Sequence, residues 1–320
     1  MRPTIAADPQ RKALEGLQAV ANSLNRKYAV PAVGRRRSLW RSQPEPQWRN
    51  AVGRRLNLSS ALLALSVLAD SGVEHYRGSF QNRLMYLPLA VSAATLAASL
   101  FGVLDARART HLGRDSLYGL AALTGTTGLV FHVYNVMKRP GGLSWQNLFY
   151  AAPVGAPVAL LLAGVLGRGA ERIRDDRGST ILGYPAGEVI SMVASAGLAG
   201  TIAEAGLLHF RGAFHNPGMF LPVVVPPTAA GLLATTLLHS GNIIRRAAKL
   251  CLKLTALLGF VGVGFHAFGV SRNMGGWRNW SQNILNGPPL PAPPSFTGLA
   301  LAGLAALSLI ERGEKADSHD

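Results

Sequence analysis

Long apolar runs, separated by short polar segments rich in arginine, recur along the chain. A helix that crosses a bilayer needs about 20 predominantly apolar residues. Runs of this kind lie at 57–75, 84–104, 116–137, 148–166, 186–208, 218–238, 252–270 and 295–311. The fourth and eighth runs are short and contain or follow prolines. The pattern predicts an all-α integral membrane protein with about eight transmembrane helices.

The basic residues are distributed unevenly between the two sets of loops in such a topology. With the N-terminus inside, only seven of the 32 Lys and Arg residues fall on the outer side, namely Arg77, Arg83, Lys138, Arg139, Arg211, Arg272 and Arg278. Because positively charged loops tend to stay in the cytoplasm, both termini are expected to be cytoplasmic. The same topology explains the net charge of +16, so no nucleic-acid partner is expected.

The composition agrees with a surface that faces lipid. Charged residues make up 15% of the chain, well below the roughly 25% typical of soluble domains, and the mean hydropathy is +0.21. The single cysteine, Cys251, excludes an internal disulfide and a multi-cysteine metal cluster. The sequence contains no phosphate-binding loop, nucleophile elbow, zinc-protease helix or dinucleotide fingerprint. The lipid bilayer is therefore the partner that the composition itself predicts.

One motif occurs twice in the chain. Residues 75–88 read HYRGSFQNRLMYLP and residues 209–222 read HFRGAFHNPGMFLP, with eight of fourteen positions identical at an offset of 134. The pairs Phe131-His132 and Gly141-Gly142 recur at that offset as Phe265-His266 and Gly275-Gly276. Chance does not maintain such a register, so the sequence predicts an internal duplication. Because each copy contains four spans, the two repeats are expected to be parallel, with the shared motifs at the outer face.

The duplication and the polar segments together divide the chain into five parts. The predicted boundaries are a basic cytoplasmic tail at 1–55, a first four-helix membrane repeat at 56–168, a cytoplasmic linker at 169–185, a second four-helix membrane repeat at 186–311 and a cytoplasmic tail at 312–320. The first tail lacks the apolar core of a secretory signal. Within it, residues 13–24 form either a short amphipathic helix on the membrane surface or part of a solvated tail.

Histidines and glycines inside the predicted spans are the first candidate site. The histidines are His75 and His132 in the first repeat and His209 and His266 in the second. An ionisable residue in a span is expensive and suggests a functional site. The helical stripe below His132 carries Gly125 and Gly128, and the stripe below His266 carries Gly259 and Gly262. A smooth glycine face admits either a flat cofactor or a closely packed neighbouring helix.

A haem b would use these residues together. Membrane b-type cytochromes take axial histidines from two helices, with small residues making room for the macrocycle. Arg77 and Arg211, two residues after the first histidine of each repeat, would then pair with the propionates. The alternative is that the histidines bond loop carbonyls or contact a solute, while the glycines pack helices.

Two acidic residues form the second candidate site. Asp70 and Glu204 occupy equivalent positions, five residues before the first histidine of each repeat. They lie about 140° around the helix from that histidine, so they need not belong to the same site. A carboxylate in a span suggests a proton relay, a cation site or a counter-ion for a nearby arginine.

The start of the second helix in each repeat also carries matched residues. Asn82 and Asn216 are expected to cap these helices. Pro88 and Pro222 are expected to end or kink the first turn.

Three functions fit these observations. The first is an electron-transfer subunit with His-ligated haem or another metal near the outer face, serving a quinol or a periplasmic redox partner. The second is a transporter or channel for a small solute or ion that uses the matched acidic, His and Arg residues. The third is a scaffold that anchors a periplasmic protein. Whether the chain is an enzyme stays open at this point.

The motif His-x-Arg-Gly-x-Phe-x-Asn resembles one that occurs in bacterial integral membrane proteins. The resemblance implies a location in the bacterial inner (cytoplasmic) membrane, and it implies no mechanism.

Overall fold

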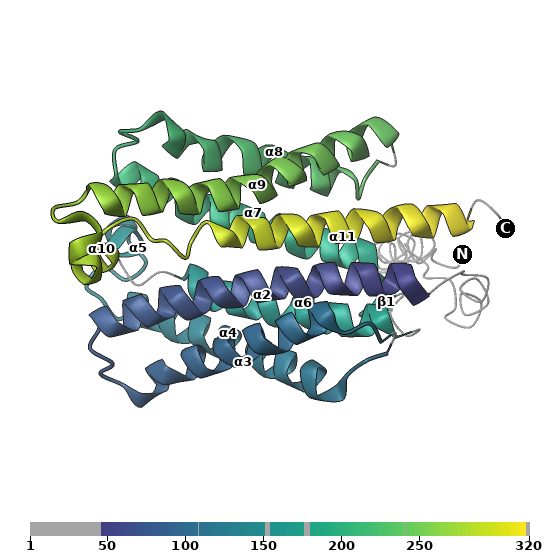
Figure 1. The fold of residues 1–320 in the computed structure, drawn as a ribbon, viewed down its shortest axis with the longest axis horizontal. Coiled ribbons are helices and arrows are strands. Elements are labelled where there is room, and N and C mark those ends of the chain that lie inside the picture. Colours follow the sequence, from purple (N-terminus) through teal and green to yellow (C-terminus); the bar gives the residue numbers. More distant parts are fainter. Residues whose placement is uncertain (1–45, 108, 151–153, 176–179, 240, 318–320) are drawn as a thin grey trace, which may run out of the picture. The chain divides into compact units, whose positions relative to one another are not determined.

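The computed structural model describes residues 46–317 apart from 108, 151–153, 176–179 and 240, and this part of the chain is predominantly helical (Figure 1). Residues 1–45, which hold most of the predicted basic tail and its segment 13–24, lie outside the described residues. The first helix begins at Pro46, well before the first predicted span at 57, and the last helix continues to Asp317, past the predicted boundary at 312.

Four helices form a first bundle, and they enclose a common interior. They are α2 (Pro46–Arg77), α3 (Leu87–Leu104), α4 (Leu112–Met137) and α6 (Gly155–Arg174). Helices α2 and α4 each pack on both α3 and α6. A 3₁₀ turn, η1 (Arg83–Tyr86), precedes α3, and the short helix α5 (Trp145–Tyr150) lies between α4 and α6.

A second bundle follows the same order of elements. Its helices are α7 (Ala186–Arg211), α8 (Leu221–Thr235), α9 (Asn242–Arg272) and α11 (Pro294–Asp317), with η2 (Pro217–Phe220) before α8 and η3 (Gly276–Asn279) and α10 (Trp280–Asn286) before α11. Helix α8 packs on α7 and α9, and the Thr297 hydroxyl of α11 donates to the Ala256 carbonyl of α9 at 2.7 Å. The backbone of α11 at Ile310 meets Gly187 of α7.

The two ends of the bundles carry different connections (Figure 1). We call one end the motif end, because the segments 75–88 and 209–222 lie there together with η3, α5 and α10. We call the opposite end the hairpin end, after the two-stranded antiparallel hairpin of β1 (Thr180–Ile181) and β2 (Tyr184–Pro185). The hairpin turns through Leu182 and Gly183, whose φ angles are 54° and 84°.

The two bundles meet through close contacts between small residues. Ser59 of α2 donates to the Gly298 carbonyl of α11 at 2.6 Å, and a Cβ added at Gly197 of α7 would lie 3.0 Å from Leu162 of α6. The largest cluster of buried apolar residues draws on α2, α6, α7, α8, α9 and α11. The main core therefore lies at the junction of the bundles and in the second bundle.

Six helices in the described part of the chain are long and apolar enough to cross a membrane. They cover Gln47–Arg77, Arg83–Leu104, Ala186–Arg211, Pro217–Thr235, Asn242–Arg272 and Pro294–Glu314. This confirms an all-α protein of the membrane class. Helices α4 and α6 occupy the third and fourth predicted runs but are not among the six, because glycines and threonines dilute α4 and charged residues fill the last turns of α6.

The fourth predicted run, 148–166, does not coincide with a single helix. The chain forms α5 over Trp145–Tyr150, and α6 then begins at Gly155 and continues to Arg174. Pro157 lies in the first turn of α6, where the missing amide hydrogen leaves no helical bond unmade. The shift brings Glu171 and Arg174 into the helix, although the sequence pattern predicted a linker at 169–185.

Candidate functional site

The two copies of the motif adopt the same turn. In each, two consecutive residues with left-handed backbone follow the end of the helix. Their φ angles are 57° and 46° at Ser79 and Phe80, and 54° and 45° at Ala213 and Phe214. Non-glycine residues rarely adopt this conformation, and each one costs on the order of 1–3 kcal/mol unless its surroundings hold it in place. The Phe80 amide donates to the His75 carbonyl at 3.0 Å, and the Phe214 amide donates to the His209 carbonyl at 3.1 Å.

The first histidine of each motif ties this turn to the next helix. The Nδ1–H of His75 donates to the Met85 carbonyl at 2.6 Å, and that of His209 donates to the Met219 carbonyl at 2.7 Å. A carbonyl oxygen can only accept, so Nδ1 carries the proton in both rings. Both histidines thus have the loop-bonding role that the sequence offered as one alternative, and Nε2 is the remaining position for any ligand.

The neighbouring motif residues also stabilise the turn. Asn82 accepts a hydrogen bond from the Leu84 amide, and Asn216 accepts one from the Gly218 amide. The predicted capping role of both asparagines is confirmed, although each caps a 3₁₀ turn that precedes the α-helix. Pro88 and Pro222 are the second residues of α3 and α8, respectively, where a proline leaves no helical hydrogen bond unmade.

His209 and His266 are brought together. Their ring centroids are 6.5 Å apart with an interplanar angle of 72°. The Nδ1–H of His266 donates to the Pro289 carbonyl at 2.7 Å. His132 is half-buried on α4, at the position that corresponds to His266 on α9. No group of three or more His, Cys, Asp or Glu side chains that could hold a metal occurs among the residues described.

The glycine faces below His132 and His266 are filled by neighbouring helices. A Cβ at Gly125 would overlap the backbone of α6 at Leu161, and one at Gly128 would lie 3.4 Å from Pro157. In the second bundle a Cβ at Gly262 would lie 2.9 Å from Pro293, the residue directly before α11. Of the two interpretations of this stripe, the geometry favours close helix packing.

Gly259 shows the same close packing. A Cβ there would lie 2.8 Å from the Pro293 carbonyl and would overlap the side chain of Thr297.

Asp70 of α2 and Glu204 of α7 are both half-buried. They lie near enough to one another for the charge of Asp70 to act on Glu204. The carboxyl group of Glu204 lies against Gly155, at the start of α6, where a Cβ would overlap it. Neither carboxyl group has a hydrogen bond or ion pair with any residue in the described ranges. The structure therefore joins two residues that the sequence had assigned only to equivalent positions.

The arginines of the motif lie at the ends of their helices. Arg77 donates to Glu74 of the same helix at 2.6 Å, so its ion pair is with Glu74 and not with Asp70. Arg211 is exposed at the end of α7.

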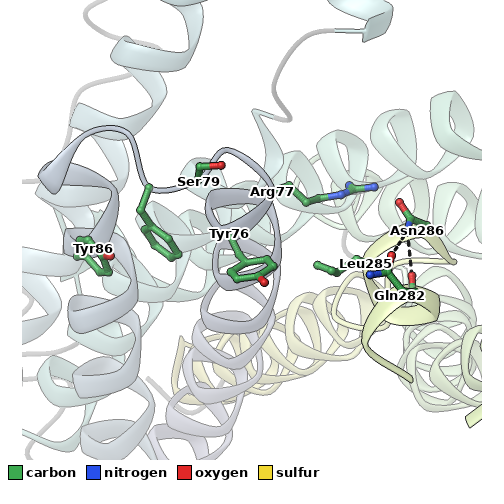
Figure 2. Close-up of a pocket in the computed structure, with 8 residues that line it drawn as sticks. Tyr76, Arg77, Ser79, Tyr86, Gln282, Leu285 and Asn286 are labelled. Atoms are coloured by element: carbon green, nitrogen blue, oxygen red, sulfur yellow. Dashed lines mark hydrogen bonds between the residues drawn. The ribbon is translucent and has the colours of Figure 1, made fainter. Parts of the chain in front are cut away.

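A depression of about 540 Å³ opens beside Arg77 at the motif end. It is lined by Tyr76, Arg77, Ser79, Phe80, Tyr86, Gln282, Leu285 and Asn286. The rings of Phe80 and Tyr86 are stacked, with centroids 4.4 Å apart. Figure 2 shows Arg77 extending from the end of α2 toward Leu285, Gln282 and Asn286 of α10. The depression thus lies between the first motif and the second bundle.

A buried ionic cluster occupies the hairpin end of the first bundle. The Arg114 guanidinium donates to Glu171 at 2.9 and 3.0 Å and to Asp105 at 2.9 Å. Arg174 donates to the carbonyls of Asp105 and Gly102. Glu171, Arg174 and Arg114 are 0%, 1% and 3% exposed.

Two further features hold this cluster together. Burial alone would raise the pKa of the Asp105 carboxyl. That pKa is held below its usual value by hydrogen bonds from the Arg107 amide and Arg114 and by the positive charges of Arg114 and Arg174. The Thr110 hydroxyl and the His111 amide both bond Glu171.

Sequence reasoning missed this cluster because its members lie far apart in the chain. Glu171 and Arg174 follow the fourth run and are three residues apart, so they would share a face if the helix continued. This spacing is the feature of the sequence that could have indicated the cluster.

The fold and these features define an α-helical membrane protein with a carboxyl pair between two helical bundles. No family model, curated protein or solved structure matches the chain.

Proposed function

We propose that this protein is a membrane transporter or channel for a small ion or solute, with Asp70 and Glu204 as its proton- or cation-binding groups. The observation that carries the proposal is the position of these two half-buried carboxyl groups: Glu204 of the second bundle lies against Gly155 at the start of α6, and Asp70 of the first bundle is near enough to act on it. Two charged carboxylates close together in an apolar setting repel one another and lose their hydration. A shared proton or a bound cation removes both penalties.

The proposal takes the chain as eight spans in two parallel four-helix repeats, with both termini in the cytoplasm of a bacterium and the motif end outside. Its support is the agreement between the two motifs. The capping residues Asn82 and Asn216 both have φ of −122°. The ring centroids of His75 and Phe80 are 6.2 Å apart in the first motif, and those of His209 and Phe214 are 6.1 Å apart in the second. In parallel-repeat transporters the substrate and the coupling ion bind at the interface of the repeats, where the carboxyl pair lies.

Substituting Asp70→Asn or Glu204→Gln is expected to lower ion flux on the order of a hundredfold, because each change removes a group that takes up the proton or cation. The full chain is purified, reconstituted into phospholipid vesicles and driven by a potassium diffusion potential. A pH-sensitive dye inside the vesicles reports proton flux, and a sodium-sensitive dye reports sodium flux.

Glu188→Gln is the matched control, since Glu188 is exposed in the first turn of α7. Its flux should equal that of the unmodified protein. The proposal is wrong if Asp70→Asn and Glu204→Gln show the same flux as Glu188→Gln and the unmodified protein. It is also wrong if the unmodified protein conducts neither protons nor sodium.

The second candidate is an electron-transfer subunit with haem b or another metal, serving a quinol or periplasmic partner. His209 and His266 favour it, because both rings have Nδ1 anchored on a carbonyl and are 6.5 Å apart. Metal-ligating histidines commonly have their second nitrogen fixed in this way. Since Pro293 and Thr297 pack against Gly259 and Gly262, the position of the two histidine rings is the support for this candidate.

Under this second candidate, a reduced-minus-oxidised spectrum of protein expressed with haem supplied should show a Soret band and an α band. His266→Ala should remove both bands, because one axial ligand is lost. His239→Ala, an exposed histidine at the hairpin end, should leave them unchanged. A featureless spectrum from well-folded protein would eliminate haem.

A further inference from the structure

One face of α2 carries three charged residues in a row near the motif end. Asp70, Glu74 and Arg77 are spaced four and three residues apart, so they follow one another along one helical stripe. Three turns earlier the same stripe contains Ser59, whose hydroxyl donates to the Gly298 carbonyl of α11. The stripe therefore lies on the side of α2 that faces the second bundle.

The outer end of this stripe is open to solvent. Arg77 lines the depression of about 540 Å³ at the motif end and extends toward α10 (Figure 2). The side chains of Arg77 and Glu74 are 45% and 36% exposed. Asp70, one turn further from the helix end, is half-buried. Glu74 thus lies between solvent and Asp70 along the helix.

Glu74 can reach a partner on either side of it. Its carboxylate accepts a hydrogen bond from Arg77 at 2.6 Å, and its charge also acts on Asp70. Residues four apart on a helix have Cβ atoms about 5–6 Å from one another. The Cα–Cβ bond of a helical residue is tilted toward the N-terminus, so Glu74 leans toward Asp70. Rotation about its side-chain bonds can therefore carry the carboxyl group from Arg77 to Asp70.

The turn of the motif does not require this acid. The equivalent position in the second motif is Leu208, whereas Arg77 is matched by Arg211. The second motif nevertheless forms the same turn, with the same left-handed pair of residues and the same histidine hydrogen bond. The carboxyl group of Glu74 is thus an addition to the first bundle that the formation of the turn leaves unexplained.

We infer that Glu74 is the outer proton acceptor of this protein and passes protons from the depression to Asp70. Its carboxylate takes up a proton from water and so loses its attraction for Arg77. The neutral carboxyl group turns to Asp70 and releases the proton to the Asp70 carboxylate. One O–H bond breaks as the other forms, and Glu74, again an anion, returns to Arg77.

The ion pair favours a proton over a metal cation at this position. A metal ion on Glu74 would keep its positive charge beside the Arg77 guanidinium, which lies 2.6 Å from the carboxylate, and like charges this close repel one another. A proton neutralises the carboxylate instead. The inference rests on the proposed function, for which it names the proton as the ion and Glu74 as the residue that takes it up.

Glu74→Gln tests the inference, because it keeps the shape of the side chain and removes the group that takes up the proton. In the vesicle assay described above, proton flux should fall by about tenfold or more, as expected when a positioned proton-transferring side chain is lost. Glu74→Asp should restore much of the flux, because it keeps a carboxyl group at this position. Glu188→Gln is again the control and should conduct like the unmodified protein.

Arg77→Gln separates proton uptake from a purely structural ion pair. Both Glu74→Gln and Arg77→Gln break the pair, but only Glu74→Gln removes the carboxyl group. Arg77→Gln should therefore conduct protons at least as well as the unmodified protein. Equal losses of flux in the two variants would mean that the pair only holds the helix end, and the inference would be wrong.

The depression is tested with a thiol label. Gln282→Cys in a Cys251→Ser background is labelled in detergent with a sulfonate-bearing methanethiosulfonate and then reconstituted. It should lose most of its proton flux, because the label occupies the depression beside Arg77. Gln146→Cys, an exposed position on the matching short helix α5, is the control. Equal flux in the two labelled proteins would show that protons do not enter through the depression.

The failure of this inference can be told from the failure of the proposed function. If Glu74→Gln conducts like the unmodified protein while Asp70→Asn does not, Glu74 is not the acceptor and the proposed function stands. The same conclusion follows if the unmodified protein conducts sodium but no protons. If it conducts neither ion, both fail.

Discussion

Glu171→Ala is expected to lower the free energy of unfolding by about 3 kcal/mol or more, because removing one partner of a buried ion pair leaves the other charge uncompensated. Glu171 is 0% exposed and accepts two hydrogen bonds from Arg114. It also accepts from the His111 amide at 2.8 Å, which ties the loop before α4 to α6. The substitution therefore removes the acceptor of the His111 amide and leaves the buried Arg114 guanidinium with one acidic partner, Asp105, in place of two.

Thermal unfolding of the detergent-purified protein measures this effect. Glu188→Ala, an exposed acidic residue on α7, is the control and should change the midpoint little. The double variant Arg114→Met/Glu171→Met should recover much of the loss, because replacing a buried pair by apolar side chains removes the uncompensated charge. A midpoint for Glu171→Ala equal to that of the control would show that the cluster contributes nothing to stability.

Gly125→Ala is the second large effect, with an expected loss of about 1–3 kcal/mol or more from overpacking. The added Cβ would overlap the backbone nitrogen of Leu161 and would lie 2.6 Å from the Pro157 carbonyl. Backbone atoms cannot rotate away as a side chain can, so α4 and α6 would have to move apart. The same substitution at Gly164 would meet the Tyr118 carbonyl and the Ala122 amide and should act in the same direction.

The matched control is Gly200→Ala on α7, where no atom lies within 4 Å of the added Cβ. Its stability should stay the same or rise slightly, because alanine favours the helix over glycine by about 1 kcal/mol. Thermal unfolding in detergent compares these variants directly. Equal midpoints for Gly125→Ala and Gly200→Ala would mean that α4 and α6 are not packed this closely.

The sequence predicted the helices well where apolar runs were long. The runs at 84–104 and 186–208 fall on helices that begin or end within a few residues of those limits. It failed at 148–166, where the chain divides into α5 and α6. Periodicity alone cannot separate two helices when the break between them contains apolar residues and prolines.

The candidate site was predicted only in part. The sequence singled out His75, His209 and the capping asparagines, and each contributes to the turns at the motif end. It gave no sign that Asp70 and Glu204 lie near one another, since the two residues are 134 positions apart. It also left the glycine faces open to two interpretations, which the position of α6 and α11 distinguishes.

The sequence by itself determined the membrane class, the approximate helices and the recurrence of the motif, because these depend on local apolar length and on identity between segments. Only the tertiary structure decided which helices pack together and what lies between them. The cluster around Glu171 and the hydrogen bonds of Tyr118 with Asn57 and Ser99 each join residues from different helices. Asp70 and Glu204 likewise come from different helices, α2 and α7. Polar side chains in a bundle interior gain most from partners on neighbouring helices, and those partners exist only once the helices are in contact.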